Sequence, residues 1–350
     1  MTDAAAPIAR DSGGMLASLE RMGEQLRTGY RLGLEAAGLP SVDGVRAMAA
    51  CGMGGSGIPG DAVRSLLGDR LGVPIVVTRG YRLPEFCHTD TLVFAVSFSG
   101  NTDEVLTAYR EAVVRGCRVV AVTSGGRLAE LAREEGVALV TIPEDVPAPR
   151  AAVGYLTGAL LGVLEATGLG PAAGQEVAEA VRVADAAAAR LGPDGADPNP
   201  ALSLARAIGS RVPVVWGSEG IAEAAATRWK TEFNENAKRP AFAASFPELD
   251  HNEIEGWSRG AGGDFFLVIL RSPSEHPSVG PRVEATLSAV ADAGLEHHEV
   301  HAEGVLPLAH LVSLLQTGGF VSCYLGLEAG IDPSPIERIE AMKSRLEALE

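Results

Sequence analysis

The segment that decides the fold is CGMGGSGIPG, residues 51–60. It follows a short apolar run (45–51) and precedes a helical pattern (60–69). A strand that ends in glycines and leads into a helix is typical of α/β proteins. The segment has neither the acidic residue that dinucleotide-binding loops place about 20 residues later nor the Gly-Lys-Ser/Thr of a P-loop. We therefore expect its backbone N–H groups and Ser56 to approach an anion at the start of the helix.

The segments on either side continue this alternation. Strand-like runs lie at 74–79, 91–97, 118–124 and 138–143, with helical patterns at 101–116 and 127–135. A second series has strands at 212–218, 264–271 and 297–303 and helices at 219–232, 281–293 and 308–328. This rhythm predicts mostly parallel sheets with helices on both faces, an αβα arrangement of three layers. We expect two such α/β domains, 1–192 and 201–350, joined by a Gly-, Pro- and Asp-rich linker at 193–200.

The chain is acidic. It has 45 Asp and Glu residues against 29 Lys and Arg, a net charge of −16 in 350 residues. Nucleic acids and anionic membranes bind surfaces with a positive field, so neither partner is expected. A small anion is not excluded, because salt screens charges beyond about 8 Å and a local group of donors then dominates.

Cysteine and histidine usage gives further limits. The chain has four widely spaced cysteines without a CxxC pair, Cys51, Cys87, Cys117 and Cys323, which favours reduced thiols in a cytoplasmic protein. The N-terminus lacks the apolar core of a signal peptide, and we find no run of about 18 uninterrupted apolar residues as in a membrane helix. The histidines, including those at 297–301, lack the spacing of metal ligands. We expect neither a metal nor another cofactor.

A second loop, SFSGNT at 97–102, joins the strand at 91–97 to the helix at 101–116. Ser97, Ser99 and Thr102 place three hydroxyls at a helix N-terminus, where the helix dipole favours an anion. Alternatively, Ser99 or Thr102 simply caps the helix. Because two such loops follow consecutive strands of one sheet, we favour an anion site at the carboxyl ends of those strands.

These segments resemble those of a known family. GMGGSG (52–57) followed by SFSGNTDE (97–104) is similar to the sugar isomerase (SIS) domain, which recognises phosphosugars with serine- and threonine-rich turns. NENAK (234–238), ELDHNE (248–253), the Ala-Pro-Arg at 148–150 and a final Asp-Pro-Ser-Pro turn leading to a lysine resemble the bifunctional phosphoglucose/phosphomannose isomerase family. That family has two SIS domains. The resemblance extends from about residue 45 to the C-terminus.

Aldose–ketose isomerisation needs a group that moves a proton between C2 and C1 through an enediol(ate), and donors that support O1 and O2. Glu235, in the polar stretch FNENAK that we expect just after a helix, is the best carboxylate for this role. Without a family context, an ordinary solvated glutamate is the favoured interpretation. The resemblance implies that Glu235 is the base. It also implies that His251 assists ring opening across a dimer interface, although a loop histidine bonded to Asp250 or Asn252 is the alternative.

The resemblance assigns further roles. It implies that the phosphate is bound by Gly55, Ser56, Ser97, Ser99 and Thr102. Arg150 would balance the phosphate or support the enediolate, and Lys343 would assist at the sugar oxygens. Lys238 and Asn234 would orient the base or serve the fold. A hydroxyl at Ser334, where many relatives have threonine, would leave room for either epimer at C2.

The expected function is therefore interconversion of glucose 6-phosphate and mannose 6-phosphate with fructose 6-phosphate by a homodimer whose active site lies at the subunit interface. Two alternatives remain: a non-catalytic phosphosugar sensor, and a SIS isomerase for an amino sugar or a pentose phosphate. The substrate is a dianion, so we expect a locally positive cleft, formed by helix N-termini, Arg150 and Lys343, on an acidic body.

Overall fold

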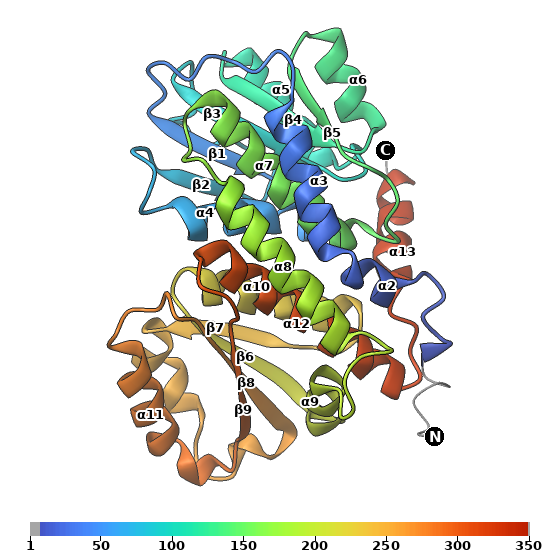
Figure 1. The fold of residues 1–350 in the computed structure, drawn as a ribbon, viewed down its shortest axis with the longest axis vertical. Coiled ribbons are helices and arrows are strands. Elements are labelled where there is room, and N and C mark those ends of the chain that lie inside the picture. The colour runs from blue at the N-terminus through green and yellow to red at the C-terminus, as the bar shows by residue number, and fades with distance from the viewer. Residues whose placement is uncertain (1–7, 349–350) are drawn as a thin grey trace.

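The computed structural model describes residues 8–348 and contains two parallel sheets, each covered by helices on both faces (Figure 1). All strand pairs that it describes are parallel. The predicted α/β architecture is thus confirmed. The segment proposed as the linker forms most of the loop between α8 (Gly174–Leu191) and α9 (Pro200–Ile208).

The first sheet has the order β2-β1-β3-β4-β5. Its strands are β1 (Ala47–Cys51), β2 (Ile75–Thr78), β3 (Thr91–Val96), β4 (Arg118–Thr123) and β5 (Ala138–Thr141). Helices α4 (Ile58–Leu67), α5 (Asp103–Val114) and α6 (Gly126–Glu134) alternate with them. The strand order reverses between β1 and β3, which is where open α/β sheets bind ligands. The two loops singled out in the sequence follow these two strands.

The second sheet has the order β7-β6-β8-β9. It comprises β6 (Val212–Ser218), β7 (Phe242–Phe246), β8 (Phe265–Arg271) and β9 (Glu296–His301), with α10 (Ile221–Glu235) and α11 (Val279–Ala289) between strands. Sequence analysis missed β7, because this edge strand is largely exposed and lacks an apolar pattern.

The predicted end of the helix at 232 was wrong. The N–H of Asn236 still donates to the carbonyl oxygen of Glu232, 2.7 Å away, so α10 continues to Glu235. Glu235 is therefore the last residue of a helix rather than part of the following loop. A helix holds the position of its side chains more firmly than a loop does.

The two sheets are joined by a layer of helices, α2 (Met15–Glu20), α3 (Met22–Leu34), α7 (Val153–Thr167), α8 and α12 (Pro307–Glu328) (Figure 1). Helices α3 and α7 touch backbone to backbone: a Cβ on Gly29 would lie 2.0 Å from the carbonyl oxygen of Tyr155. A Cβ on Gly158 would likewise lie 2.3 Å from the carbonyl oxygen of Leu26. Part of the glycine excess thus serves helix packing.

Among the described residues, α12 is the one helix long and apolar enough to cross a membrane. The sequence predicted this helix but not its membrane-like character, because His310 and scattered Ser, Thr and Gln residues interrupt the apolar run. In the fold, 94% of its most apolar 18-residue window is buried. A helix that is apolar on all sides can form the centre of a large core, as α12 does here.

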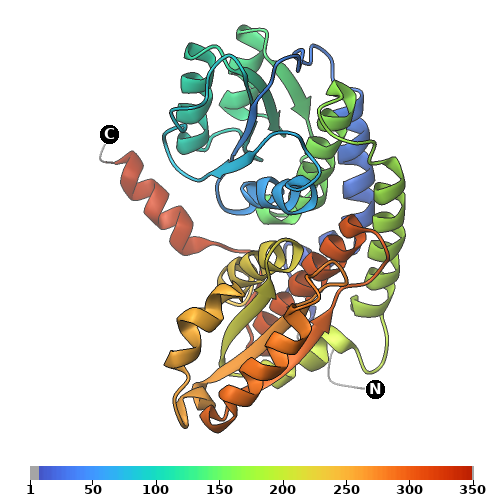
Figure 2. The same ribbon diagram turned by 90° about the vertical axis from the view of Figure 1, so that its left-hand side faces the viewer.

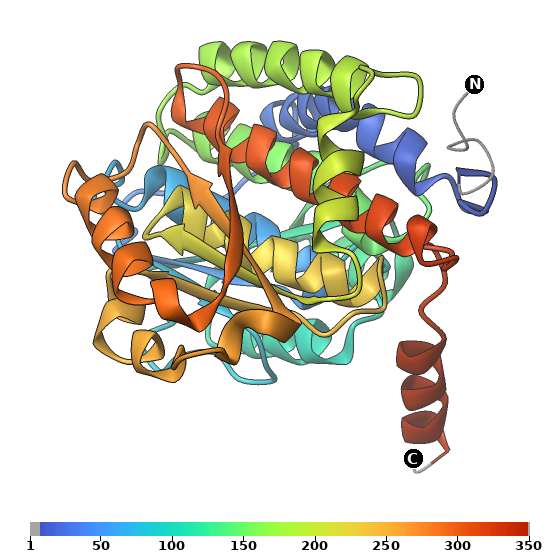
Figure 3. The same cartoon turned by 90° about the horizontal axis from the view of Figure 1, so that it is seen from below.

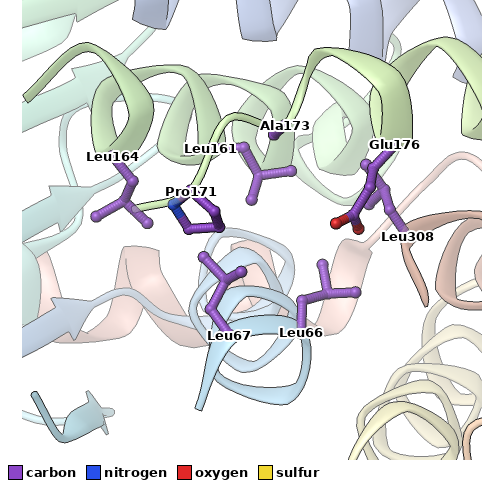
Figure 4. A pocket seen from close by; sticks show the side chains of 8 residues that line it. All are labelled: Leu66, Leu67, Leu161, Leu164, Pro171, Ala173, Glu176 and Leu308. Atoms are coloured by element: carbon purple, nitrogen blue, oxygen red, sulfur yellow. The ribbon is translucent and has the colours of Figure 1, made fainter. Parts of the chain in front are cut away.

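The helix layer is tightly packed where α4 meets α7, α8 and α12 (Figure 4). Leu66 and Leu67 of α4 face Leu161 and Leu164 of α7 across a void of about 10 Å³. Such a void is at the lower limit for a single water molecule. It is a packing seam between helices rather than a ligand site.

Candidate active site

The loops after β1 and β3 are hydrogen-bonded to each other. The N–H of Phe98 donates to Ser56 Oγ at 3.0 Å, and Ser97 Oγ lies 2.9 Å from Thr102 Oγ1. Ser97 Oγ also accepts from the N–H of Gly100 at 3.1 Å, and Ser99 Oγ accepts from the N–H of Asn101 at 3.3 Å. The structure thus brings the hydroxyls of the predicted phosphate loops together at one sheet edge.

The first turns of α4 and α5 keep their N–H groups free of side-chain caps. Thr102 occupies the N-cap position of α5, but its hydroxyl bonds to Ser97 and makes no capping bond. Gly57, at the N-cap of α4, has no side chain. The simple-cap alternative therefore does not describe Thr102. Two uncapped helix N-termini beside several hydroxyls provide donors for a phosphate.

Arg150 connects segments that are far apart in the sequence. Its side chain is only 1% exposed, and its guanidinium donates to Asn236 Oδ1 at 2.7 Å and to the carbonyl oxygens of Pro333 and Ser334 at 2.7 and 3.1 Å. The remaining amino group, Nη1, lies 3.3 Å from Glu235 Oε2. Burial lowers the pKa of Arg150, and Glu235 opposes that shift. The guanidinium is therefore fixed in place and directs one amino group at the predicted base.

Gly55 brings the phosphate loops next to this arginine. A Cβ on Gly55 would lie 2.6 Å from the Cα of Arg150 and 2.9 Å from its backbone nitrogen. Only glycine fits this contact without a shift of the backbone. The first-domain loops and the end of α10 thus meet at residue 150.

Glu235 lines a cavity of about 540 Å³ with Asn234, Lys238 and residues between Ile331 and Ile339. Its side chain is 22% exposed, so one side remains accessible. Lys238 has a left-handed backbone (φ 54°), and its Nζ donates to the carbonyl oxygens of Glu235 and Pro333. Burial and the charge of Arg150 lower the pKa of Lys238. Arg150 and Lys238 are thus cations next to Glu235, and the same cavity is also lined by Arg338 and by the acidic Asp332 and Glu337.

The two oxygen atoms of Ser334 differ in their hydrogen bonding. Its carbonyl oxygen accepts from Arg150, whereas its Oγ is buried and has no hydrogen-bond partner among residues 8–348. A buried hydroxyl without a partner costs free energy unless a ligand or water satisfies it. The sequence-based suggestion of a substrate contact at Ser334 stays a prediction that this geometry supports.

Two predicted site residues lie elsewhere in the single chain. His251 is exposed at the end of a 3₁₀ turn, and its neighbours bond to other groups: Asp250 accepts from Arg282 at 2.9 Å, and Asn252 donates to Glu248 at 2.8 Å. Lys343 is exposed on α13 (Glu337–Glu347), a helix that projects away from the body of the molecule (Figures 2 and 3). Neither residue is among those that line the cavity at Glu235.

Another cavity, of about 790 Å³, lies at the carboxyl ends of β6 and β8. Its charged residues include Arg64 and Arg70 but also Glu219 and Glu223, so both signs meet there. Within the described chain, the first loop adjoins the backbone of Arg150 at Gly55, and the Arg150 guanidinium adjoins the Glu235 carboxylate. The cavity beside Glu235 is lined by residues at the end of α10, by Lys238 and by residues of the C-terminal segment, and by none from the two loops. We place the candidate active site at this junction.

Sequence analysis missed several groups that hold this site. Asn236 is fully buried, accepts from Arg150 and donates to Ser322 Oγ at 2.9 Å. Arg228 and Glu232 form a buried pair one turn earlier on α10. The NENAK motif pointed to Asn236, but no local pattern could indicate that it faces Arg150. No group of three or more His, Cys, Asp or Glu residues within the described chain is arranged to hold a metal ion.

Known proteins resemble this chain in sequence and in fold. Residues 197–346 match the family model described as the bacterial phospho-glucose isomerase C-terminal SIS domain. A bifunctional phosphoglucose/phosphomannose isomerase of Caldicellulosiruptor bescii is 32% identical over 335 residues, which cover 95% of this chain and 98% of that protein. The chain belongs to the bifunctional phosphoglucose/phosphomannose isomerase family.

The chain is also similar to proteins with other names. A D-glucosamine-6-phosphate 4-epimerase of Sulfolobus acidocaldarius is 32% identical over a match that covers 71% of this chain and 76% of that protein. Among solved structures, a hypothetical protein of Thermus thermophilus superposes with a TM-score of 0.73 at 18% identity, covering 98% of this chain and 92% of the other. At that identity the superposition shows a shared fold alone.

Proposed function

We propose that this protein is an isomerase that interconverts glucose 6-phosphate and mannose 6-phosphate with fructose 6-phosphate. The observation that carries the proposal is the contact between Glu235 and the buried Arg150, next to the loops of the first sheet. A carboxylate lies beside a fixed cation, and the backbone of that cation packs against Gly55 of the first loop. Membership of the isomerase family supports the same activity.

The phosphate binds first in this scheme. The hydroxyls of Ser56, Ser97, Ser99 and Thr102 and the N–H groups of the first turns of α4 and α5 surround it without any lysine. These donors belong to the rigid edge of a sheet, so they hold the sugar in one orientation. Positioning of this kind removes much of the entropic cost of the reaction.

Proton transfer follows at Glu235. Its carboxylate removes the proton from C2 of the open-chain aldose, and the C2–H electron pair forms the double bond of the enediolate while C1=O becomes C1–O⁻. The proton on O2 then moves to O1⁻, and Glu235 returns its proton to C1, which leaves a carbonyl at C2 and gives the ketose. In this scheme the Nη1 group of Arg150, 3.3 Å from Glu235 Oε2, stabilises the negative oxygen. Protonation at C2 from the other face during the reverse reaction gives the other epimer, and a small residue at Ser334 leaves room for both.

The proposal includes a homodimer with the active site at the subunit interface. Helix α13 supports this part, because all of its residues from Glu337 to Leu346 are exposed and its apolar side chains Ile339, Met342 and Leu346 lie at helical spacing. An 11-residue helix without a packing partner is only marginally stable in water. A second copy would cover it and could supply His251 or Lys343 to a site that lacks both in the single chain.

Deletion of residues 337–350 tests the dimer. The shortened chain should sediment as a monomer and lose most of its turnover, whereas the full chain should sediment as a dimer. The single change Met342→Glu, which puts a charge on the apolar side of the same helix, should weaken association in the same direction. A monomeric full chain with full activity would contradict the interface proposal.

The activity is tested with purified protein and separate coupled assays on glucose, mannose and glucosamine 6-phosphates. We expect turnover of the first two and exchange of the C2 proton with deuterated water. Turnover of glucosamine 6-phosphate alone would instead favour amino-sugar chemistry. Binding without turnover or exchange would favour the sensor.

We also propose that the protein acts in the cytoplasm. Cys51, Cys87, Cys117 and Cys323 are free thiols, and three of them are buried. Free thiols are typical of reducing compartments. Cell fractionation with detection of the protein tests this, and recovery outside the cytoplasmic fraction would contradict it.

A further inference from the structure

Helix α10 contacts residue 150 at two places. Near its end, Glu235 and Asn236 bond to the guanidinium of Arg150. Earlier on the same face, Nη2 of Arg228 donates to the backbone carbonyl oxygen of Arg150 at 2.5 Å. The seven steps from residue 228 to residue 235 correspond to a rise of about 10 Å along a helix. The backbone and the side chain of Arg150 are therefore both held by one rigid element.

Arg228 is part of a buried ion pair. Its Nη2 also lies 2.7 Å from Glu232 Oε1, and both side chains are only 2% exposed. Three of the pair's polar atoms, Arg228 Nε, Arg228 Nη1 and Glu232 Oε2, have no hydrogen-bond partner among the described residues. An incompletely bonded ion pair in a core contributes little or nothing to stability compared with apolar side chains of similar volume.

The hydrogen bond from Arg228 to the carbonyl oxygen of Arg150 indicates a role for the ion pair other than stability. We propose that Arg228 and Glu232 are positioning residues for the isomerase: Glu232 orients the guanidinium of Arg228, which holds the backbone of residue 150 so that the Arg150 side chain meets Glu235. Because Gly55 packs directly on the Cα of Arg150, the same bond fixes the phosphate loop relative to the base. This inference rests on the proposed function.

The decisive variant replaces the pair by apolar residues, Arg228→Met with Glu232→Leu. It should fold with an unchanged or higher melting temperature, because no buried charge is left unpaired. Its kcat should fall about 10²-fold, the effect of a displacement of about 1 Å at a reacting centre, with KM within about threefold of wild type. The deuterium isotope effect at C2 should rise, because proton transfer becomes the slow step.

A control is the partly buried pair at the end of β8, changed to Arg271→Met with Glu275→Leu; Glu299, which also pairs with Arg271, is changed to Gln in the same variant. It should leave kcat and the isotope effect unchanged. Arg228→Lys is the second test variant, because Nη2 makes both bonds and the ammonium of the shorter lysine side chain ends one bond nearer the backbone. It should fold and lose about tenfold in kcat at constant KM.

The outcomes separate the two proposals. Full kcat in the folded double variant, or in Arg228→Lys, would overturn the positioning role. Failure of the double variant to fold leaves Arg228→Lys to decide. Amide hydrogen exchange of residues 150–152, measured without substrate, should become faster in both variants. Wild-type protein without isomerase activity would refute the proposed function, whereas unchanged exchange at 150–152 would refute the positioning.

Discussion

Replacement of Glu235 by glutamine tests the assignment of the base most directly. The amide has nearly the same shape as the carboxylate, and its oxygen can still accept from Arg150 Nη1, which lies 3.3 Å from Glu235 Oε2 in the native site. Arg150 also keeps its bonds to Asn236 and to the two carbonyl oxygens of residues 333 and 334. The change therefore removes a basic oxygen and a charge and little else.

The structure sets the expected sizes of the two effects. Glu235 is 22% exposed and makes a single ion pair, so the loss of stability should stay at about 1–2 kcal/mol. A positioned general base contributes about 10²–10⁴ in rate, or about 3–5.5 kcal/mol of activation free energy. Turnover should thus fall far more than stability does, and binding of fructose 6-phosphate should remain.

The assay measures turnover by coupled reduction of nicotinamide cofactor, binding by calorimetry, and C2 proton exchange by NMR in deuterated water. Glu223→Gln is the matched control, because Glu223 lies on the same helix but lines the other cavity. The control should keep wild-type rates. Turnover of Glu235→Gln within about threefold of wild type, or C2 exchange at the wild-type rate, would refute the role of Glu235 as the base.

Three further predictions concern other parts of the molecule. Ser334→Ala should keep or slightly raise the melting temperature, because the buried hydroxyl has no partner in the described chain. The change should raise KM about tenfold, and an unchanged KM would exclude a substrate contact. Gly55→Ala should lose about 1–3 kcal/mol of stability, because the new methyl group would overlap Arg150. It should also weaken the binding of inorganic phosphate in calorimetry, and unchanged binding would contradict the proposed phosphate site. Burial raises the pKa of Cys51 from 9.0 to about 12, so the folded state favours the neutral thiol and loses stability as the pH rises above 9.0. Cys51→Ala should flatten this alkaline loss in urea unfolding, and an equally steep loss in the variant would assign it to other groups.

The sequence determined the local features of the fold. Runs of β-branched residues between helical patterns predicted both sheets, because strand and helix periodicities are properties of short segments. Glycine and serine loops predicted the anion site at β1 and β3, since parallel strands end at the same sheet edge. The edge strand β7 escaped this reasoning because its exposed residues carry no such periodicity.

The motifs also indicated candidate site residues. NENAK pointed to Glu235 and Lys238, and the structure places both at one cavity. The motifs could not give the last turn of α10, whose residues are polar and resemble a loop. That turn forms because Asn236 and Glu235 face the buried Arg150, a contact between segments far apart in the sequence.

Tertiary structure alone decided what surrounds Arg150. Gly55, Arg228, Asn236 and Ser334 meet there from loops and helices of both domains. Sequence spacing cannot reveal such a meeting, because burial and hydrogen bonding depend on how whole sheets and helices pack. Local sequence therefore predicted the phosphate loops and the base, whereas the packing of the sheets and helices decides what surrounds Arg150.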